Sequence, residues 1–194
     1  MSRGGAGLPK SEYNGAEPAI LGSEVGAMAT TTTERELDGT VTEYEDISVG
    51  GDRVERLLRE LFTEHWARLT VGPLIQGAAW EIRFRTPPRV SMLDGYLTVD
   101  TGAWHFHLCV GDGPATTPDD LARARRVARA AFFRTVGGSC SPETYGLRLW
   151  NGLGEQMITV LFPNPYYDDA SQRLPEPDRA RTALWEATRG RYRA

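Results

Sequence analysis

Apolar residues recur every three to four positions between Asp52 and about Gly72, and this period predicts an amphipathic helix. Asp52 is a suitable N-cap, and Glu55 follows three residues later, as in a capping box. The apolar stripe consists of Val54, Leu57, Leu58, Leu61, Phe62 and, near its end, His65. Because His65 shares this stripe, we expect its side chain to face the body of the domain.

Three segments after this helix alternate between apolar and polar residues, which is the pattern of half-buried strands. They are residues 78–85, 90–100 and 104–109. In the first segment Glu81 and Arg83 share the polar face. The second is expected to bend or bulge at Asp94-Gly95.

The second half of the chain predicts two more helices and a hairpin. Thr117-Pro118 suits a helix start and Gly137-Gly138 its end, so residues 117 to about 135 are expected to be helical. Strands at 145–150 and 156–162 flank Asn151–Gly154, a strong hairpin signal. A final helix is expected from Pro177-Asp178 to about Tyr192.

The predicted order is α-βββ-α-ββ-α, which favours an α+β fold. We expect a mostly antiparallel sheet of about five strands with helices packed on one face. Residues 46–194 would form this single domain, and residues 1–45 a flexible N-terminal tail, because no sustained period runs through the tail. Within the tail, Ile20-Leu21 and residues 41–47 are the segments able to dock on the domain, the latter as a short strand.

Composition and charge set limits on the partners of the protein. The net charge of −4 gives no reason to expect binding to nucleic acid or to an anionic membrane. No apolar run approaches the ~20 residues that span a bilayer, and the N-terminus lacks the pattern of a secretory signal. Two widely spaced cysteines fit a reducing compartment, so we expect a cytoplasmic protein.

The segment Trp104–Cys109 carries most of the metal-binding capacity of the chain, which has only three histidines and two cysteines. On a strand, His105, His107 and Cys109 share one face. The two imidazoles can converge on one ion at Zn–N distances of about 2.0–2.1 Å. Cys109 lies about 13 Å along the strand from His105, so one ion held by all three needs a bend.

The third metal ligand is left open among four residues. Cys109 is one, Glu81 would complete two histidines and a carboxylate, Cys140 lies in a Gly-Ser-rich loop, and His65 projects from the first helix. Each also has an ordinary structural explanation, as a buried, solvated or loop side chain.

The polar faces of several strands would combine if these strands are neighbours. Arg83 and Arg148 would then lie beside the histidines and bind a small anionic molecule. The leading hypothesis is a small enzyme that depends on a divalent Zn, Fe or Cu ion. The alternatives are a non-catalytic metal carrier or haem-binding protein, and a protein-interaction domain that forms, for example, a homodimer. A nucleophilic pair of His107 with Cys109 or Cys140 is a further, weaker alternative.

Overall fold

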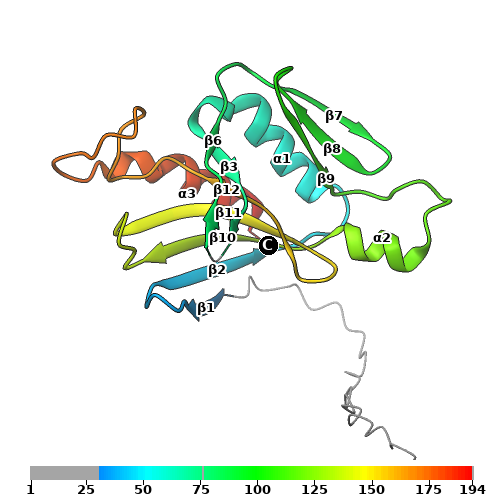
Figure 1. Cartoon of the computed structure of the whole chain (residues 1–194), viewed down its shortest axis with the longest axis horizontal. Coiled ribbons are helices and arrows are strands. Elements are labelled where there is room, and N and C mark those ends of the chain that lie inside the picture. Colours follow the sequence, from blue (N-terminus) through cyan, green and yellow to red (C-terminus); the bar gives the residue numbers. More distant parts are fainter. Residues whose placement is uncertain (1–30, 76, 194) are drawn as a thin grey trace, which may run out of the picture.

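The computed structural model describes residues 31–75 and 77–193, which contain a seven-stranded antiparallel sheet, here called the large sheet (Figure 1). The strands lie in the order β1-β2-β10-β11-β12-β3-β6. Their bounds are β1 Thr31–Arg35, β2 Val41–Ile47, β3 Thr70–Gly72, β6 Ile82–Arg83, β10 Val127–Val136, β11 Glu143–Asn151 and β12 Gln156–Leu161.

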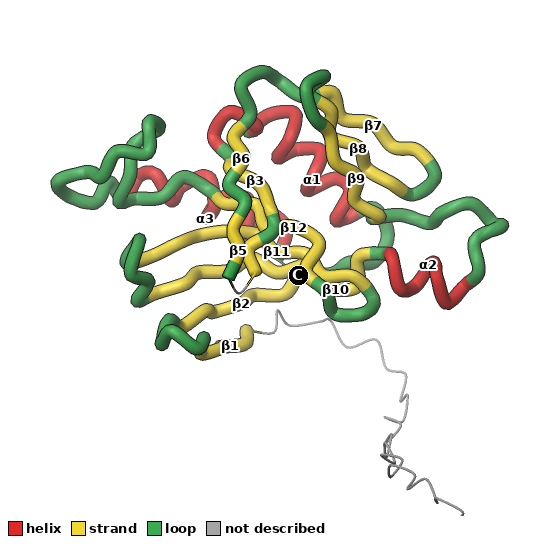
Figure 2. The backbone as a smooth tube through the Cα atoms, in the orientation of Figure 1, coloured by secondary structure: helices red, strands yellow, loops and turns green. Residues whose placement is uncertain are grey.

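A second, three-stranded antiparallel sheet, here called the small sheet, stands apart from the large one (Figure 2). It consists of β7 Arg89–Leu93, β8 Tyr96–Asp100 and β9 His105–Cys109. Asp94 and Gly95 both have positive φ and form the tight turn between β7 and β8. A two-stranded hairpin, β4 Leu74–Ile75 and β5 Ala78–Ala79, completes the strands of the described residues.

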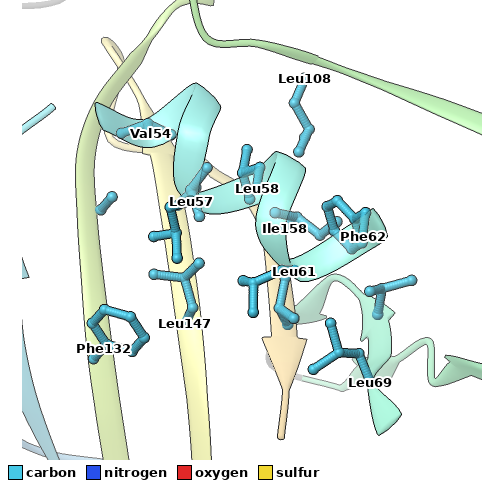
Figure 3. Packing of buried hydrophobic residues seen from close by; sticks show 14 of the residues in the cluster. Val54, Leu57, Leu58, Leu61, Phe62, Leu69, Leu108, Phe132, Leu147 and Ile158 are labelled. Carbon is cyan, nitrogen blue, oxygen red and sulfur yellow. The ribbon is translucent and has the colours of Figure 1, made fainter. Parts of the chain in front are cut away.

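Helix α1 (Arg53–Glu64) lies between the large and the small sheet (Figures 1 and 3). Its apolar residues pack against Leu147 of the large sheet and Leu108 of the small sheet in one cluster. Leu57 and Leu61 are completely buried there. Full burial of a leucine side chain contributes about 1.5–3 kcal/mol, so this helix joins the two sheets into one core.

The other helices are shorter. Helix α3 (Ala183–Tyr192) follows the 3₁₀ helix η2 (Arg179–Thr182). Trp185 of α3 packs in the same core as α1, and its Nε1 donates to the carbonyl oxygen of Gly146 at 3.0 Å. The 3₁₀ helix η1 (Trp66–Arg68) follows α1, and α2 (Asp119–Arg125) precedes β10. Within the described residues, no helix has the length and apolar character required to cross a membrane.

The mixed α+β class with a mostly antiparallel sheet is confirmed, but the predicted strand count and order are not. The helix expected over residues 117–135 is wrong beyond Arg125, because Val127–Val136 forms β10 in the middle of the large sheet. Phe132 packs into the main core, whereas Phe133 packs on the opposite face with Tyr44. A strand that is buried on both faces carries a continuous apolar run, which lacks the alternation of a half-buried strand.

Two further expectations need correction. Residues 41–47 form the expected short strand, β2, but residues 31–35 of the assigned tail also form a strand, β1, so the sheet begins before residue 46. Residues 1–30 of that tail, with Ile20-Leu21, lie outside the described residues. The single strand expected over 78–85 is also wrong, because only residues 78–79 and 82–83 are strands, in two different sheets.

Candidate functional site

A cavity of about 790 Å³ lies between the outer face of the small sheet and helix α2, and we call it the β9–α2 pocket. The outer face exists because side chains of β8 and β9 alternate. Leu97, Val99 and Leu108 point into the core with α1, whereas Tyr96, Thr98, His107 and Cys109 line the pocket. The other walls are the loop 111–117 and residues of α2.

His107 is held in the wall of this pocket by its neighbour on β8. Thr98 and His107 are directly opposite in the β8–β9 register, and Thr98 Oγ1 lies 2.7 Å from His107 Nδ1. When Nδ1 carries the proton and donates it to this oxygen, the lone pair of Nε2 is available to a ligand. The pair therefore presents one oriented imidazole to the pocket.

Three arginines lie on the opposite wall. Arg123, Arg125 and Arg126 come from α2 and the residue after it, and Arg126 pairs with Asp112 across the pocket mouth. Within the described residues, Arg123 and Arg125 have no carboxylate at ion-pair distance. The lining also includes Asp94, Asp112 and Asp119. Guanidinium groups without an ion-pair partner are well suited to bind carboxylates of a ligand.

Cys109 forms part of the pocket wall next to Tyr96. Its side chain is buried, and its thiol is uncharged at neutral pH. Burial raises the pKa of the Cys109 thiol, and a hydrogen bond with Tyr96 offsets only part of this effect. Cys140 is exposed, and both cysteines are free thiols. The sulfur of Cys109 is therefore a poor nucleophile or metal ligand unless a bound group deprotonates it.

The structure brings together the two predicted histidine ligands but not a third. The His105 and His107 rings lie on one face with their centroids 5.0 Å apart. His65 is at the end of α1, where its Nε2 lies 3.8 Å from a carboxylate oxygen of Glu60. Glu81 and Cys140 line a different cavity. Within the described residues, no group of three or more His, Cys, Asp or Glu side chains is placed to hold a metal ion.

The expectation of one shared polar sheet face is wrong. Arg83 is on β6 of the large sheet and His107 is on β9 of the small sheet, so the two residues do not share a sheet face. Arg148 is half-buried on β11, donates to the Tyr44 hydroxyl and lies 4.8 Å from the centre of the Phe133 ring. Its guanidinium is therefore occupied within the fold.

Several pocket residues were absent from the sequence-based set. Thr98 and Tyr96 alternate with buried residues of β8, so the sequence pattern could have placed them on the polar face of the strand. Only the strand register pairs Thr98 with His107. The arginines of α2 carry no signal of their own, because the sequence does not show that this short helix stands beside β9.

Comparisons with known proteins place the chain in a family. A solved structure titled "Crystal structure of ChuX" has a TM-score of 0.47 and 15% sequence identity to this chain, and the alignment covers 76% of this chain and 78% of that one. A comparison with curated proteins finds no match. The model of the "family of unknown function (DUF7676)" matches residues 31–194. The chain therefore belongs to this family, DUF7676.

Proposed function

We propose that the protein binds haem without covalent attachment in the β9–α2 pocket, as a binding or carrier protein. The observation that carries this proposal is that the oriented His107 imidazole, Arg123 and Arg125 line one cavity. The volume of about 790 Å³ falls within the usual range of cofactor sites, about 300–1,000 Å³.

The number of available ligands favours haem over a bare metal ion. A protein-bound Zn ion needs three or four side-chain ligands, whereas haem iron already has four porphyrin nitrogens and needs one axial histidine. The pocket has one histidine in its wall, and no cluster of three ligand residues occurs among the described residues. The metal-dependent enzyme is therefore the weaker hypothesis.

Each part of the pocket has a role in this proposal. His107 Nε2 would ligate the iron, and the hydrogen bond from Nδ1 to Thr98 would orient the ring. Arg123 and Arg125 would pair with the propionates. Tyr96 and Leu93 would contact the flat apolar body of the ligand. When bound, haem supplies a redox-active iron centre.

The test is a hemin titration of the full chain without a histidine tag, followed by visible absorption. The wild type should bind one hemin with a shifted Soret band. His107→Ala should change this band and weaken binding at least about tenfold, equal to ~1.4 kcal/mol. His105→Ala is the matched control, because His105 is on the same strand and face but is not among the described residues that line the pocket.

Three results would reject the proposal. The first is a wild type that shows no saturable hemin binding. The second is a His107→Ala variant with unchanged spectrum and affinity. The third is equal loss in both histidine variants, together with Zn binding by the wild type, which would restore the two-histidine metal site.

A further inference from the structure

A second and larger cavity, of about 1370 Å³, lies at the edge of the large sheet, and we call it the β6 groove. Its walls include η1, β6, the loop after β10 and the loop after β12. Glu81, Arg83 and Cys140, which sequence analysis selected for a single site with the histidines, all line this groove instead. Charged and thiol side chains therefore line a second cavity, which is separate from the β9–α2 pocket.

Four arginines line the β6 groove, and three of them have no carboxylate partner. Arg181 pairs with the Asp169 carboxylate. Arg83 donates to the backbone carbonyl of Asp169 and to Thr70 Oγ1. Within the described residues, no carboxylate lies at ion-pair distance from Arg68, Arg83 or Arg85. Arg68 and Arg85 retain the capacity to bind an added anion, and Arg83 keeps its Nη2 group for this purpose.

Of the acidic side chains of the groove, Asp169 partly offsets the arginine charge, because its carboxylate pairs with Arg181 and interacts with the charges of Arg68 and Arg83. Asp168 accepts hydrogen bonds from the backbone of Ala170 and Gln172 in its own loop. Asp38 is likewise used locally, accepting from the backbone and side chain of Thr40. Glu81 remains as an exposed carboxylate on the wall.

Arg83 and Arg181 both contact Asp169, Arg83 at the backbone carbonyl and Arg181 at the carboxylate. The hydrogen bond from Arg181 lowers the pKa of Asp169, and the charges of Arg181, Arg68 and Arg83 act in the same direction. The charge of Arg68 acts on the same carboxylate, and Arg85 lines the same groove. An anionic ligand at this end of the groove would experience the same attraction.

One wall of the groove is aromatic. Trp104 is half-buried and packs on Phe106, with ring centroids 6.2 Å apart and an angle of 12° between the rings. Phe84 supports the same indole at 5.3 Å. A rigidly supported indole at the edge of a cavity provides a flat surface for a planar ligand.

We infer that the β6 groove binds a small molecule in which a phosphate or carboxylate group is attached to a planar aromatic body. Arg68, Arg83 and Arg85 bind the anionic group, since the guanidinium fork matches planar and tetrahedral oxyanions. Trp104 contacts the aromatic body. This site is separate from the β9–α2 pocket, because the two cavities have no lining residue in common.

The test uses 2-naphthyl phosphate as the probe, with calorimetry on the full chain. Neutral 2-naphthol reports the aromatic contribution alone, and 2-naphthoate separates carboxylate from phosphate preference. The Arg68→Gln/Arg85→Gln variant should bind 2-naphthyl phosphate at least about tenfold more weakly, because charge-assisted hydrogen bonds are lost. Binding of 2-naphthol should not change. Both arginines are exposed, so the fold should be retained, and its melting temperature checks this.

The matched control is Arg56→Gln/Arg89→Gln, which removes the same number of charges from exposed arginines that line neither cavity. This control should bind 2-naphthyl phosphate as the wild type does. The inference is overturned if the wild type binds neither anionic probe, if the Arg68/Arg85 variant keeps wild-type affinity, or if the control loses binding to the same extent. A hemin titration of the same variants distinguishes failure at this site from failure of the haem proposal.

Discussion

Thr98 Oγ1 lies 2.7 Å from Nδ1 of His107, across the β8–β9 pair. The contact depends on direct register, because side chains opposite each other in antiparallel strands lie about 4.5–5.5 Å apart at Cβ. The hydrogen bond uses one ring nitrogen and leaves Nε2 for the pocket. Thr98 is thus the positioning residue of the proposed iron ligand.

Replacing Thr98 by Val keeps the shape of the side chain but removes the hydrogen bond to His107. We expect hemin affinity to fall about 10- to 100-fold, as for other partners of metal-bound histidines. Thr98→Ser keeps the hydroxyl and should remain close to the wild type. Hemin titrations measure the affinity of both variants, and melting curves check that both retain the fold. Equal affinity in Thr98→Val and Thr98→Ser would show that the hydroxyl does not act on the site.

Gly152, in the hairpin after β11, fixes helix α2 against the large sheet. Its backbone N–H donates to the carbonyl oxygen of Ala124 at 3.2 Å. A Cβ atom on Gly152 would lie 2.1 Å from the carbonyl oxygen of Arg123, so no side chain fits unless the helix moves. The position of the pocket arginines therefore depends on a residue that does not touch the pocket.

Gly152→Ala should consequently affect stability and binding together. We expect a loss of about 1–3 kcal/mol of stability from overpacking, and weaker hemin binding because α2 is displaced. Gly190→Ala is the control, since a Cβ there meets no atom within 4 Å and alanine favours the helix. Urea unfolding and hemin titration measure the two effects. A destabilised variant with unchanged hemin affinity would exclude α2 as a wall of the binding site.

The parts of the fold that sequence analysis predicted well are those with a single exposed face. Helix α1 has one wide apolar stripe, and β9 has one apolar and one polar face, so periodicity identifies both. Strand β10 is buried on both faces and follows a helix directly, so its apolar run was joined to that helix. Such a strand is distinguished from a helix only by its partners in the sheet.

The candidate site was predicted only within one strand. Alternation correctly placed His105 and His107 on a common face. It could not show that the chain leaves the large sheet after Arg83 and forms a separate sheet. Residues far apart in sequence, such as Arg148 and His107, were therefore assigned to one surface although they belong to different sheets. Long-range strand pairing is a tertiary property that local patterns do not contain.

Glu143 on β11 makes the stability of the protein sensitive to acid. Burial alone would raise the pKa of Glu143, but hydrogen bonds from Arg134, Arg179 and Tyr145 outweigh it and lower the pKa to about 2. A carboxyl whose pKa is lower in the folded than in the unfolded state stabilises the fold above its unfolded pKa. This contribution is fully present above about pH 4.5 and is lost as the pH falls towards 2.

Glu143→Gln should remove this pH dependence. At neutral pH the variant should lose about 1–3 kcal/mol, because three donors lose a charged partner. Between pH 5 and pH 2 its stability should fall less steeply than that of the wild type, since the titrating group is gone. Glu64→Gln, an exposed change on α1, is the control. Urea unfolding at several pH values measures the free energy of unfolding. If this free energy falls equally steeply with pH in the wild type and in Glu143→Gln, the lowered pKa of Glu143 is contradicted.

The two cysteines should differ in reactivity towards a thiol reagent such as Ellman's reagent. Cys140 is exposed, whereas Cys109 is buried with a raised pKa, so less of it is thiolate at neutral pH. We expect one fast and one slow thiol, with Cys140→Ser removing the fast phase and Cys109→Ser the slow one. Because Cys109 lines the β9–α2 pocket, hemin should slow the second phase further and leave the first unchanged. Equal rates for the two thiols would contradict the burial of Cys109, and hemin protection of Cys140 instead would place the ligand elsewhere.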